Sequence, residues 1–168
     1  GDPVPSARFM GGREWSRLMD GRDPAVTAED VEAVLARGVM LFPAVEANSG
    51  PFPGRAARWS VPEEGLPDGQ RAVAASWYLA LMTDVCLDLI GAEGPVVVEG
   101  PLASNARFTE MLAAVRAGGL ASSGNASTGT SAGAALLALP SRQPGDAEAV
   151  GGERVRAPRL AAYAARWR

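Results

Sequence analysis

The segment from Val96 to Asn105 has the residue types of a ligand-binding turn. Val96 to Val98 are three consecutive β-branched residues, which predict a buried strand, and Gly100-Pro101 predicts a sharp turn. Ser104 or Asn105 would cap the helix that follows over residues 106–117. A glycine turn at a helix start exposes backbone N–H groups and lets a flat ring lie close to the backbone, which suits a nucleotide. An ordinary strand-to-helix connection in an α/β domain would show the same pattern, so both interpretations stay open.

A second helix start has the same character. The stretch from Gly124 to Ala135 contains Gly, Ala, Ser, Thr and one Asn, and Thr130 or Ser131 would cap an apolar helix that ends at Leu139. If the two helix starts converge, they would surround one ligand. Close packing of two helices explains the small residues equally well.

Two residue types are absent, and their absence narrows the chemistry. The chain has no histidine, and all 16 basic residues are arginine. Ser-His and Cys-His nucleophiles, most zinc sites, Schiff bases and a P-loop lysine are therefore excluded for this chain. A net charge of −3 also argues against a nucleic-acid partner. The single Cys86 is expected to be a small core residue rather than a nucleophile.

Length and composition predict one compact domain. The chain has 168 residues, of which 47% are hydrophobic, and this is ample for a core. We expect residues 1–168 to form a single domain without a membrane span, because apolar runs such as Ala132 to Leu139 are too short. No signal-peptide pattern is present at the start, so we expect a cytoplasmic location.

Alternating helical and strand patterns predict an α/β fold with a sheet covered by helices. Apolar spacing and glycine stops give the following elements: a strand over 8–10, a Gly11-Gly12 turn, a helix to about Met19, a helix from Thr27 to Gly38, a strand over Val39 to Phe42, a helix over Gln70 to Ile90, a strand over Leu120 to Ser122, and a closing helix over Arg159 to Trp167. Thr27 and Asp30 have the spacing of a capping box. Prolines and glycines make residues 43–69 a long irregular loop, either ordered by its aromatic residues or flexible.

Three groups of charged residues are weighed as candidate functional sites. Glu99 would lie beside the turn and would orient a ribose hydroxyl or a magnesium-bound water, or simply be solvated. Asp84 and Asp88 lie one helical turn apart, and we interpret them as an exposed stripe rather than paired catalytic carboxylates. The arginines near the C-terminus are interpreted as a solvated or interdomain face, and they are Arg154, Arg156, Arg159, Arg166 and Arg168.

The order of four motifs resembles the second domain of FGGY carbohydrate kinases. They are Gly-Gly-Arg-Glu at 11–14, Arg71-Ala72, Val-Glu-Gly-Pro-Leu-Ala-Ser-Asn at 98–105, and Thr-Ser-Ala-Gly-Ala-Ala-Leu-Leu-Ala at 130–138. The resemblance extends from about Arg8 to Leu139. It implies an actin-like ATPase, ribonuclease-H-like fold, with a mixed sheet flanked by helices. It also implies that ATP and a sugar bind between two domains and that a sugar hydroxyl is phosphorylated.

The resemblance places nucleotide-binding residues in two of these motifs. They are Gly100, Pro101, Leu102, Ala103, Ser104, Asn105 and Gly133. Gly100 would leave room for the adenine, and Asn105 would hydrogen-bond the base or hold the turn. Pro101 departs from the family pattern, in which a second glycine is common, and its missing N–H cannot bind a ligand.

The resemblance also implies what this chain would need from elsewhere. The family's first domain carries the catalytic aspartate and a phosphate-binding turn, and neither has a counterpart here. We therefore expect this chain to be inactive alone, to supply the adenosine side of a Mg-ATP site, and to serve a kinase acting on a ketose, deoxyketose or polyol. A homodimer is compatible with this. The alternatives are a scaffold of the same fold, which binds a partner through residues 43–69, and a Rossmann-like dinucleotide binder, although no Gly-x-Gly-x-x-Gly is present.

Overall fold

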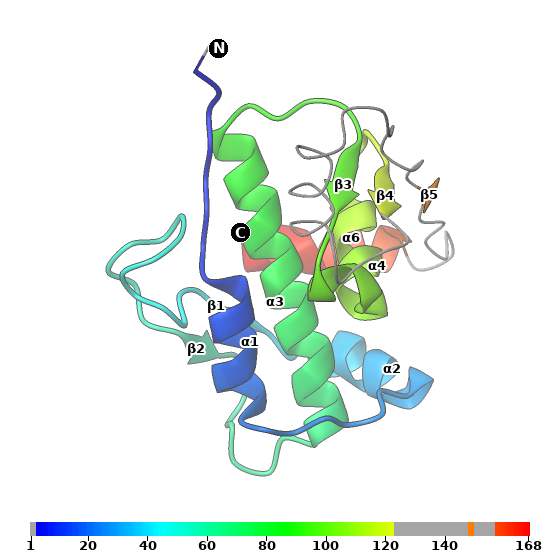
Figure 1. Ribbon diagram of the computed structural model, residues 1–168. Helices are drawn as coiled ribbons and strands as arrows, with labels where there is room; N and C mark the ends of the chain where they lie inside the picture. Colours follow the sequence, from blue (N-terminus) through cyan, green and yellow to red (C-terminus); the bar gives the residue numbers. More distant parts are fainter. Residues whose placement is uncertain (1–2, 123–147, 150–156) are drawn as a thin grey trace.

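The computed structural model describes residues 3–122, 148–149 and 157–168, and Figure 1 shows its elements along the long helix α3. In chain order these are α1 (Gly11–Met19), α2 (Ala28–Arg37), β1 (Leu41–Phe42), β2 (Arg58–Trp59), α3 (Asp68–Leu89), β3 (Val96–Val98), the 3-10 helix η1 (Pro101–Ser104), α4 (Ala106–Val115), β4 (Leu120–Ser122), β5 (Glu148–Ala149) and α6 (Ala157–Trp167). The predicted helix from Thr130 or Ser131 to Leu139, with Gly133, lies outside the described residues.

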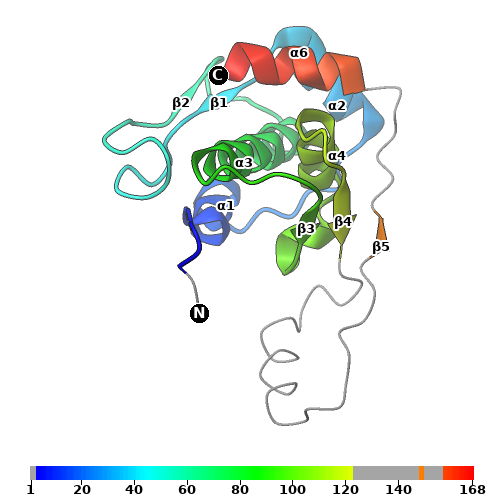
Figure 2. The same cartoon turned by 90° about the horizontal axis from the view of Figure 1, so that it is seen from above.

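Helix α3 forms the centre of the hydrophobic core. Figure 2 looks along this helix and shows α1, α2, α4 and α6 arranged around it. Trp77, Leu79, Leu81 and Met82 are fully buried on different sides of the helix. By length and composition α3 would be able to cross a membrane, but 72% of its apolar window is buried within the fold, as in the core helix of a folded domain. The expectation that every apolar run is too short to span overlooked this helix.

The larger sheet has three short strands and mixed directions. β3 pairs with β4 in parallel, with Val96 opposite Leu120, and β4 pairs with β5 antiparallel. Val98 is buried, but Val97 is 53% exposed because successive side chains of a strand point to opposite faces. The prediction that all three valines are buried was therefore wrong for Val97. A second, two-stranded antiparallel sheet joins β1 and β2.

Two predicted helix caps are confirmed. The Thr27 hydroxyl accepts a hydrogen bond from the Asp30 backbone N–H, and the Asp30 carboxylate accepts one from the Thr27 backbone N–H, which is a capping box. Gly38 ends the same helix with φ 63°, in the left-handed region where glycine is favoured. Asn105 caps α4, so Ser104 is not the cap.

The first helix differs from its prediction. Gly11 and Gly12 form the first turn of α1 rather than a separate turn, and residues 8–10 form no strand. The Glu14 backbone N–H donates to the Met10 carbonyl at 2.9 Å, which closes the first helical turn. Packing of α1 against α3 overrides the low helix propensity of the two glycines.

The loop over residues 43–69 is ordered against its own chain. The ring of Phe52 packs edge-on against Trp167 of α6 at 5.9 Å between centroids. The Arg58 guanidinium lies over the Phe42 ring at 4.4 Å and comes from the short strand β2. Of the two interpretations left open, the structure favours the ordered loop. The last two residues of the range, Asp68 and Gly69, already belong to α3.

Candidate functional site

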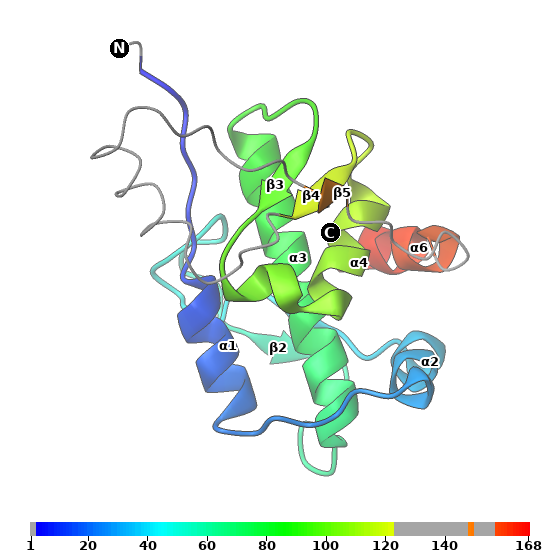
Figure 3. The ribbon, with the colours of Figure 1, turned by 45° about the vertical axis from the view of Figure 1, so that its right-hand side comes forward.

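A cavity of about 620 Å³ lies where the β3–α4 connection, α1 and the N-terminal half of α3 meet. Figure 3 shows the β3–α4 connection beside the start of α1. Gly12 and Trp15 form one wall, Ala72 and Ser76 of α3 another, and the α1–α2 connection contributes Asp23, Pro24 and Val26. The remaining lining residues are Glu99, Pro101, Leu102, Ser104, Asn105, Ala106 and Arg107.

The structure brings four of the seven predicted site residues to this cavity, namely Pro101, Leu102, Ser104 and Asn105. Gly100 and Ala103 do not line it, and Ala103 packs against the hydrophobic core. Gly133 lies outside the described residues. The predicted turn is thus a wall of a real cavity, and its partner walls come from α1 and α3.

Gly100 is required by the backbone of the turn. Its φ of 79° and ψ of −167° fall in a region that is essentially restricted to glycine. A Cβ atom at this position would meet no atom within 4 Å, so conformation rather than crowding within the chain explains the residue. Pro101 then takes the first position of η1, where its missing N–H costs no helical hydrogen bond.

Asn105 joins the turn to α4 and α3. Its side-chain oxygen accepts hydrogen bonds from the backbone N–H groups of Arg107 and Phe108, at 3.1 and 3.0 Å. Its amide nitrogen donates to Ser76 Oγ at 3.0 Å, and that hydroxyl donates to the Ala72 carbonyl at 2.7 Å. These contacts match one predicted role of Asn105, that of holding the turn, and the other role, a hydrogen bond to the base, stays a prediction.

The charged groups around the cavity are mainly acidic. Asp23 and Glu99 line it, and neither has an ion-pair partner among the residues that the structure describes. Arg107 is the guanidinium among the described lining residues, and it pairs with Glu110 at 2.7 Å. Uncompensated carboxylates at a cavity favour ligands with hydroxyl or amine donors.

A buried carboxyl holds the α1 wall in place. Glu14 is fully buried and accepts a hydrogen bond from the Tyr78 hydroxyl of α3. Burial raises the pKa of Glu14 above its ordinary value, and the hydrogen bond from Tyr78 opposes this effect. Burial also raises the pKa of the Tyr78 hydroxyl, which therefore stays a donor. This contact joins α1, which also carries Trp15, to α3.

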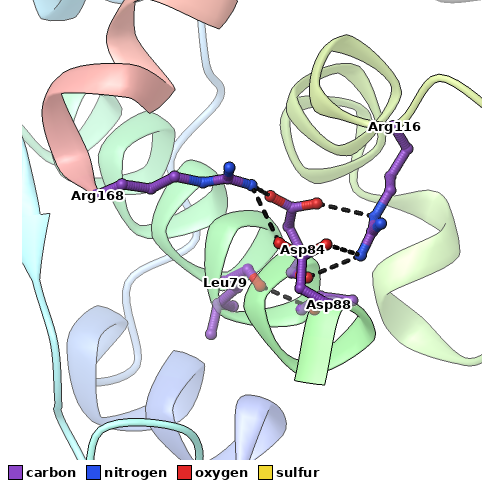
Figure 4. Close-up of polar contacts among 6 residues, drawn as sticks. Leu79, Asp84, Asp88, Arg116 and Arg168 are labelled. Carbon is purple, nitrogen blue, oxygen red and sulfur yellow. Dashed lines mark hydrogen bonds and ion pairs between the residues drawn. The ribbon is translucent and has the colours of Figure 1, made fainter. Parts of the chain in front are cut away.

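At the other end of α3, Asp84 and Asp88 form an ion-pair cluster with two arginines (Figure 4). Arg116 pairs with Asp84 at 2.8 Å and with Asp88 at 3.1 Å, and Arg168 contacts both carboxylates. The Asp84 side chain is 1% exposed, so the predicted exposed stripe was wrong for Asp84. Arg168, which we predicted to lie on a solvated or interdomain face, has a side chain that is 48% exposed, and it also neutralises the buried Asp84 carboxylate.

Comparisons with known proteins identify the family. A family model described as the C-terminal domain of carbohydrate kinase FGGY matches residues 1–147. The chain belongs to the FGGY carbohydrate kinase family. A crystal structure of a carbohydrate kinase from Novosphingobium aromaticivorans is similar to it, with 32% sequence identity and a TM-score of 0.77. That match covers 95% of this chain and 36% of the kinase, and a search of curated proteins gave no match.

The predicted fold class is confirmed. An FGGY C-terminal domain with a mixed sheet and packed helices is α/β and is consistent with the actin-like ATPase fold. Cys86 is 7% exposed in this FGGY domain, and burial raises the pKa of its thiol, as expected for a core residue rather than a nucleophile. Among the described residues, no group of three or more His, Cys, Asp or Glu side chains is placed to hold a metal ion.

Sequence reasoning missed most of the lining residues that lie outside the predicted motif, among them Trp15, Asp23 and Ser76 of this FGGY domain. Ser76 could have been noticed, because it is the polar residue within the otherwise apolar stretch from Ala72 to Met82 of α3. Trp15 and Asp23 gave no such signal, since an aromatic residue on an amphipathic helix and an acid in a loop are ordinary features. Their role becomes visible when the packing of α1 against α3 is known.

Proposed function

We propose that this chain is the nucleotide-side domain of an ATP-dependent carbohydrate kinase, which phosphorylates a hydroxyl of a ketose, deoxyketose or polyol. The observation that carries the proposal is the cavity of about 620 Å³ between η1, α1 and α3, which is lined by four residues of the predicted adenosine motif. The volume and mixed polarity suit a small-molecule ligand. ATP would bring Mg²⁺ with its phosphates.

The chain would be inactive without a second domain. Phosphoryl transfer depends on positioning the attacking hydroxyl and on stabilising the charge of the transferred group. The cavity has carboxylates but no unpaired guanidinium among its described lining residues, so it offers no cation to stabilise the charge of the transferred phosphoryl group. Nucleotide binding is the part of the reaction that this chain would contribute. A cytoplasmic location and a homodimer stay predictions.

The test is a calorimetric titration of Mg-ATP, and separately of NAD, into the chain. We expect Mg-ATP to bind and NAD not to bind, and we expect Asn105→Ala to weaken Mg-ATP binding at least fivefold because it releases the η1 turn. Asp88→Asn, at the far end of α3, is the control and should leave binding unchanged. Binding of NAD in preference to Mg-ATP would support the dinucleotide-binding alternative instead.

Turnover is tested in the same samples. The chain should form no sugar phosphate from Mg-ATP and a ketose or polyol. When it is joined to a first domain of an FGGY kinase, it should support transfer. A folded chain that binds no adenine nucleotide in either form would favour the scaffold alternative.

A further inference from the structure

We propose that the cavity binds the nucleoside half of the nucleotide, with the base stacked on Trp15 and the phosphates held outside. This inference rests on the proposed function and names a residue that would hold the base. Trp15 is not part of the predicted adenosine motif, since it lies on α1, far from that motif in the sequence.

The position of Trp15 fits a stacking role. Its side chain lines the cavity from α1, whereas Pro101 and Leu102 line it from η1. A planar base in the cavity would therefore lie between the indole ring and an apolar turn. The preceding residue, Glu14, is fully buried and bonded to Tyr78, so α1 is fixed on α3 and Trp15 needs little reordering when a ligand binds.

The charge distribution excludes the phosphates from the same space. Asp23 and Glu99 line the cavity without described ion-pair partners, and Arg107 is already paired with Glu110. A triphosphate beside two carboxylates would be repelled, whereas ribose hydroxyls would donate hydrogen bonds to them. The ligand is thereby oriented with its base and ribose inside and its phosphates toward solvent or a partner domain.

The experiment titrates adenosine and Mg-ATP separately into the full chain and follows tryptophan fluorescence and heat. Trp15→Leu removes the ring, and Trp15→Phe keeps an aromatic face. Trp59→Leu is the matched control, because Trp59 is also partly buried but lines a different hollow and lies next to Arg71. Circular dichroism and a melting curve check that each variant is folded.

We expect adenosine to bind with an affinity similar to that of Mg-ATP and to quench fluorescence. Trp15→Leu should weaken both ligands about tenfold, Trp15→Phe should restore most of the affinity, and Trp59→Leu should change neither affinity nor quenching by adenosine. If Trp15 had a purely structural role, Trp15→Leu would lower the melting temperature, and the ligand affinities of the Leu and Phe variants would not differ in this way.

Two results would overturn the inference while leaving the proposed function intact. One is equal binding by the wild-type chain and a folded Trp15→Leu variant. The other is binding of Mg-ATP without binding of adenosine, which would place recognition at the phosphates. A wild-type chain that binds neither ligand would overturn the inference and the proposed function together.

Discussion

Acidic side chains near the two ends of α3 lie in opposite electrostatic environments. At its C-terminal half, Asp84 is buried and neutralised by Arg116 and Arg168, which fastens α3 to the ends of α4 and α6. At its N-terminal half, the helix faces a cavity whose carboxylates, Asp23 and Glu99, have no described ion-pair partner.

The difference separates structural charges from charges available to a ligand. A buried carboxylate needs its cations to compensate for lost hydration, so the Asp84 cluster holds three helices together. A carboxylate beside a cavity keeps its water and can exchange it for ligand hydroxyl groups. Substitutions in the Asp84 cluster should therefore alter the stability of the fold, and substitutions of Asp23 and Glu99 should alter ligand binding.

The largest effect is expected from Asp84→Ala. The substitution removes the charge-assisted contacts of the buried Asp84 carboxylate with Arg116 and Arg168, and because both arginines keep a contact with Asp88 the loss should be about 3 kcal/mol. Urea denaturation should show this loss in the free energy of unfolding. Asp88→Asn is the control, because the Asp88 side chain is 53% exposed and its loss should cost under about 1 kcal/mol. Equal effects of the two substitutions would contradict the distinction between them.

An intermediate loss of stability is expected from Asn105→Ala, which also changes the lining of the cavity. The variant loses the cap of α4 and the hydrogen bond to Ser76, together about 2 kcal/mol. Thermal melting measures the loss. Ser104→Ala removes a single exposed hydrogen bond to the Pro101 carbonyl and should cost under about 0.5 kcal/mol. If Ser104→Ala were the more damaging change, Asn105 would not be the residue that holds the turn.

A smaller effect, visible as a pH dependence, is expected at Glu14. Burial raises the folded-state pKa of Glu14 above the ordinary value of 4.5. Its contribution to stability is therefore fully present below about pH 4.5 and is lost as the pH rises through the folded pKa. Glu14→Gln keeps an acceptor for Tyr78 and should flatten the stability profile above pH 4.5, where the wild-type protein loses stability as the pH rises. Exposed Glu64→Gln should leave the profile unchanged, and an unaltered slope in Glu14→Gln would refute the assignment.

The smallest effect on stability is expected from the double substitution Asp23→Asn and Glu99→Gln. Neither carboxylate has a described ion-pair partner, so the free energy of unfolding should change by less than about 0.5 kcal/mol. Removing two negative charges from the cavity wall lowers the long-range repulsion of the phosphates, so Mg-ATP should bind about twofold to fivefold more tightly and adenosine binding should be unchanged or weaker. Urea denaturation measures the stability and calorimetry the affinity. A clear fall in the free energy of unfolding of the double variant would show that these carboxylates are structural and would contradict the prediction.

Local signals were enough to predict much of the fold. The capping box of Thr27 and Asp30 and the apolar residues of α3 act within a few residues, so these helices were predicted within two residues of their observed starts. Asn105 was recognised as one of two possible caps for the same reason. The strand Val96–Val98 and the turn after it also follow from local residue types.

Contacts between distant residues were not predictable in this way. Arg116 and Arg168 lie 32 and 84 residues after Asp84. The sequence around Asp84 therefore gives no indication of these ion-pair partners. The helical state of Gly11-Gly12 depends on packing of α1 against α3, and the Glu14–Tyr78 bond spans 64 residues. The same packing creates the Trp15 wall, so sequence reasoning found one side of the cavity and missed the other.

The most direct test of the central claim is a nitrogen–hydrogen correlation NMR spectrum of the chain recorded with increasing adenosine. We expect the backbone amide signals of Gly12, Ser76, Leu102 and Asn105 to shift together and saturate, while those of Asp84 and Asp88 stay fixed. Shifts centred on the Asp84 end of α3, or no shifts at saturating adenosine, would contradict a nucleoside site between α1, α3 and η1.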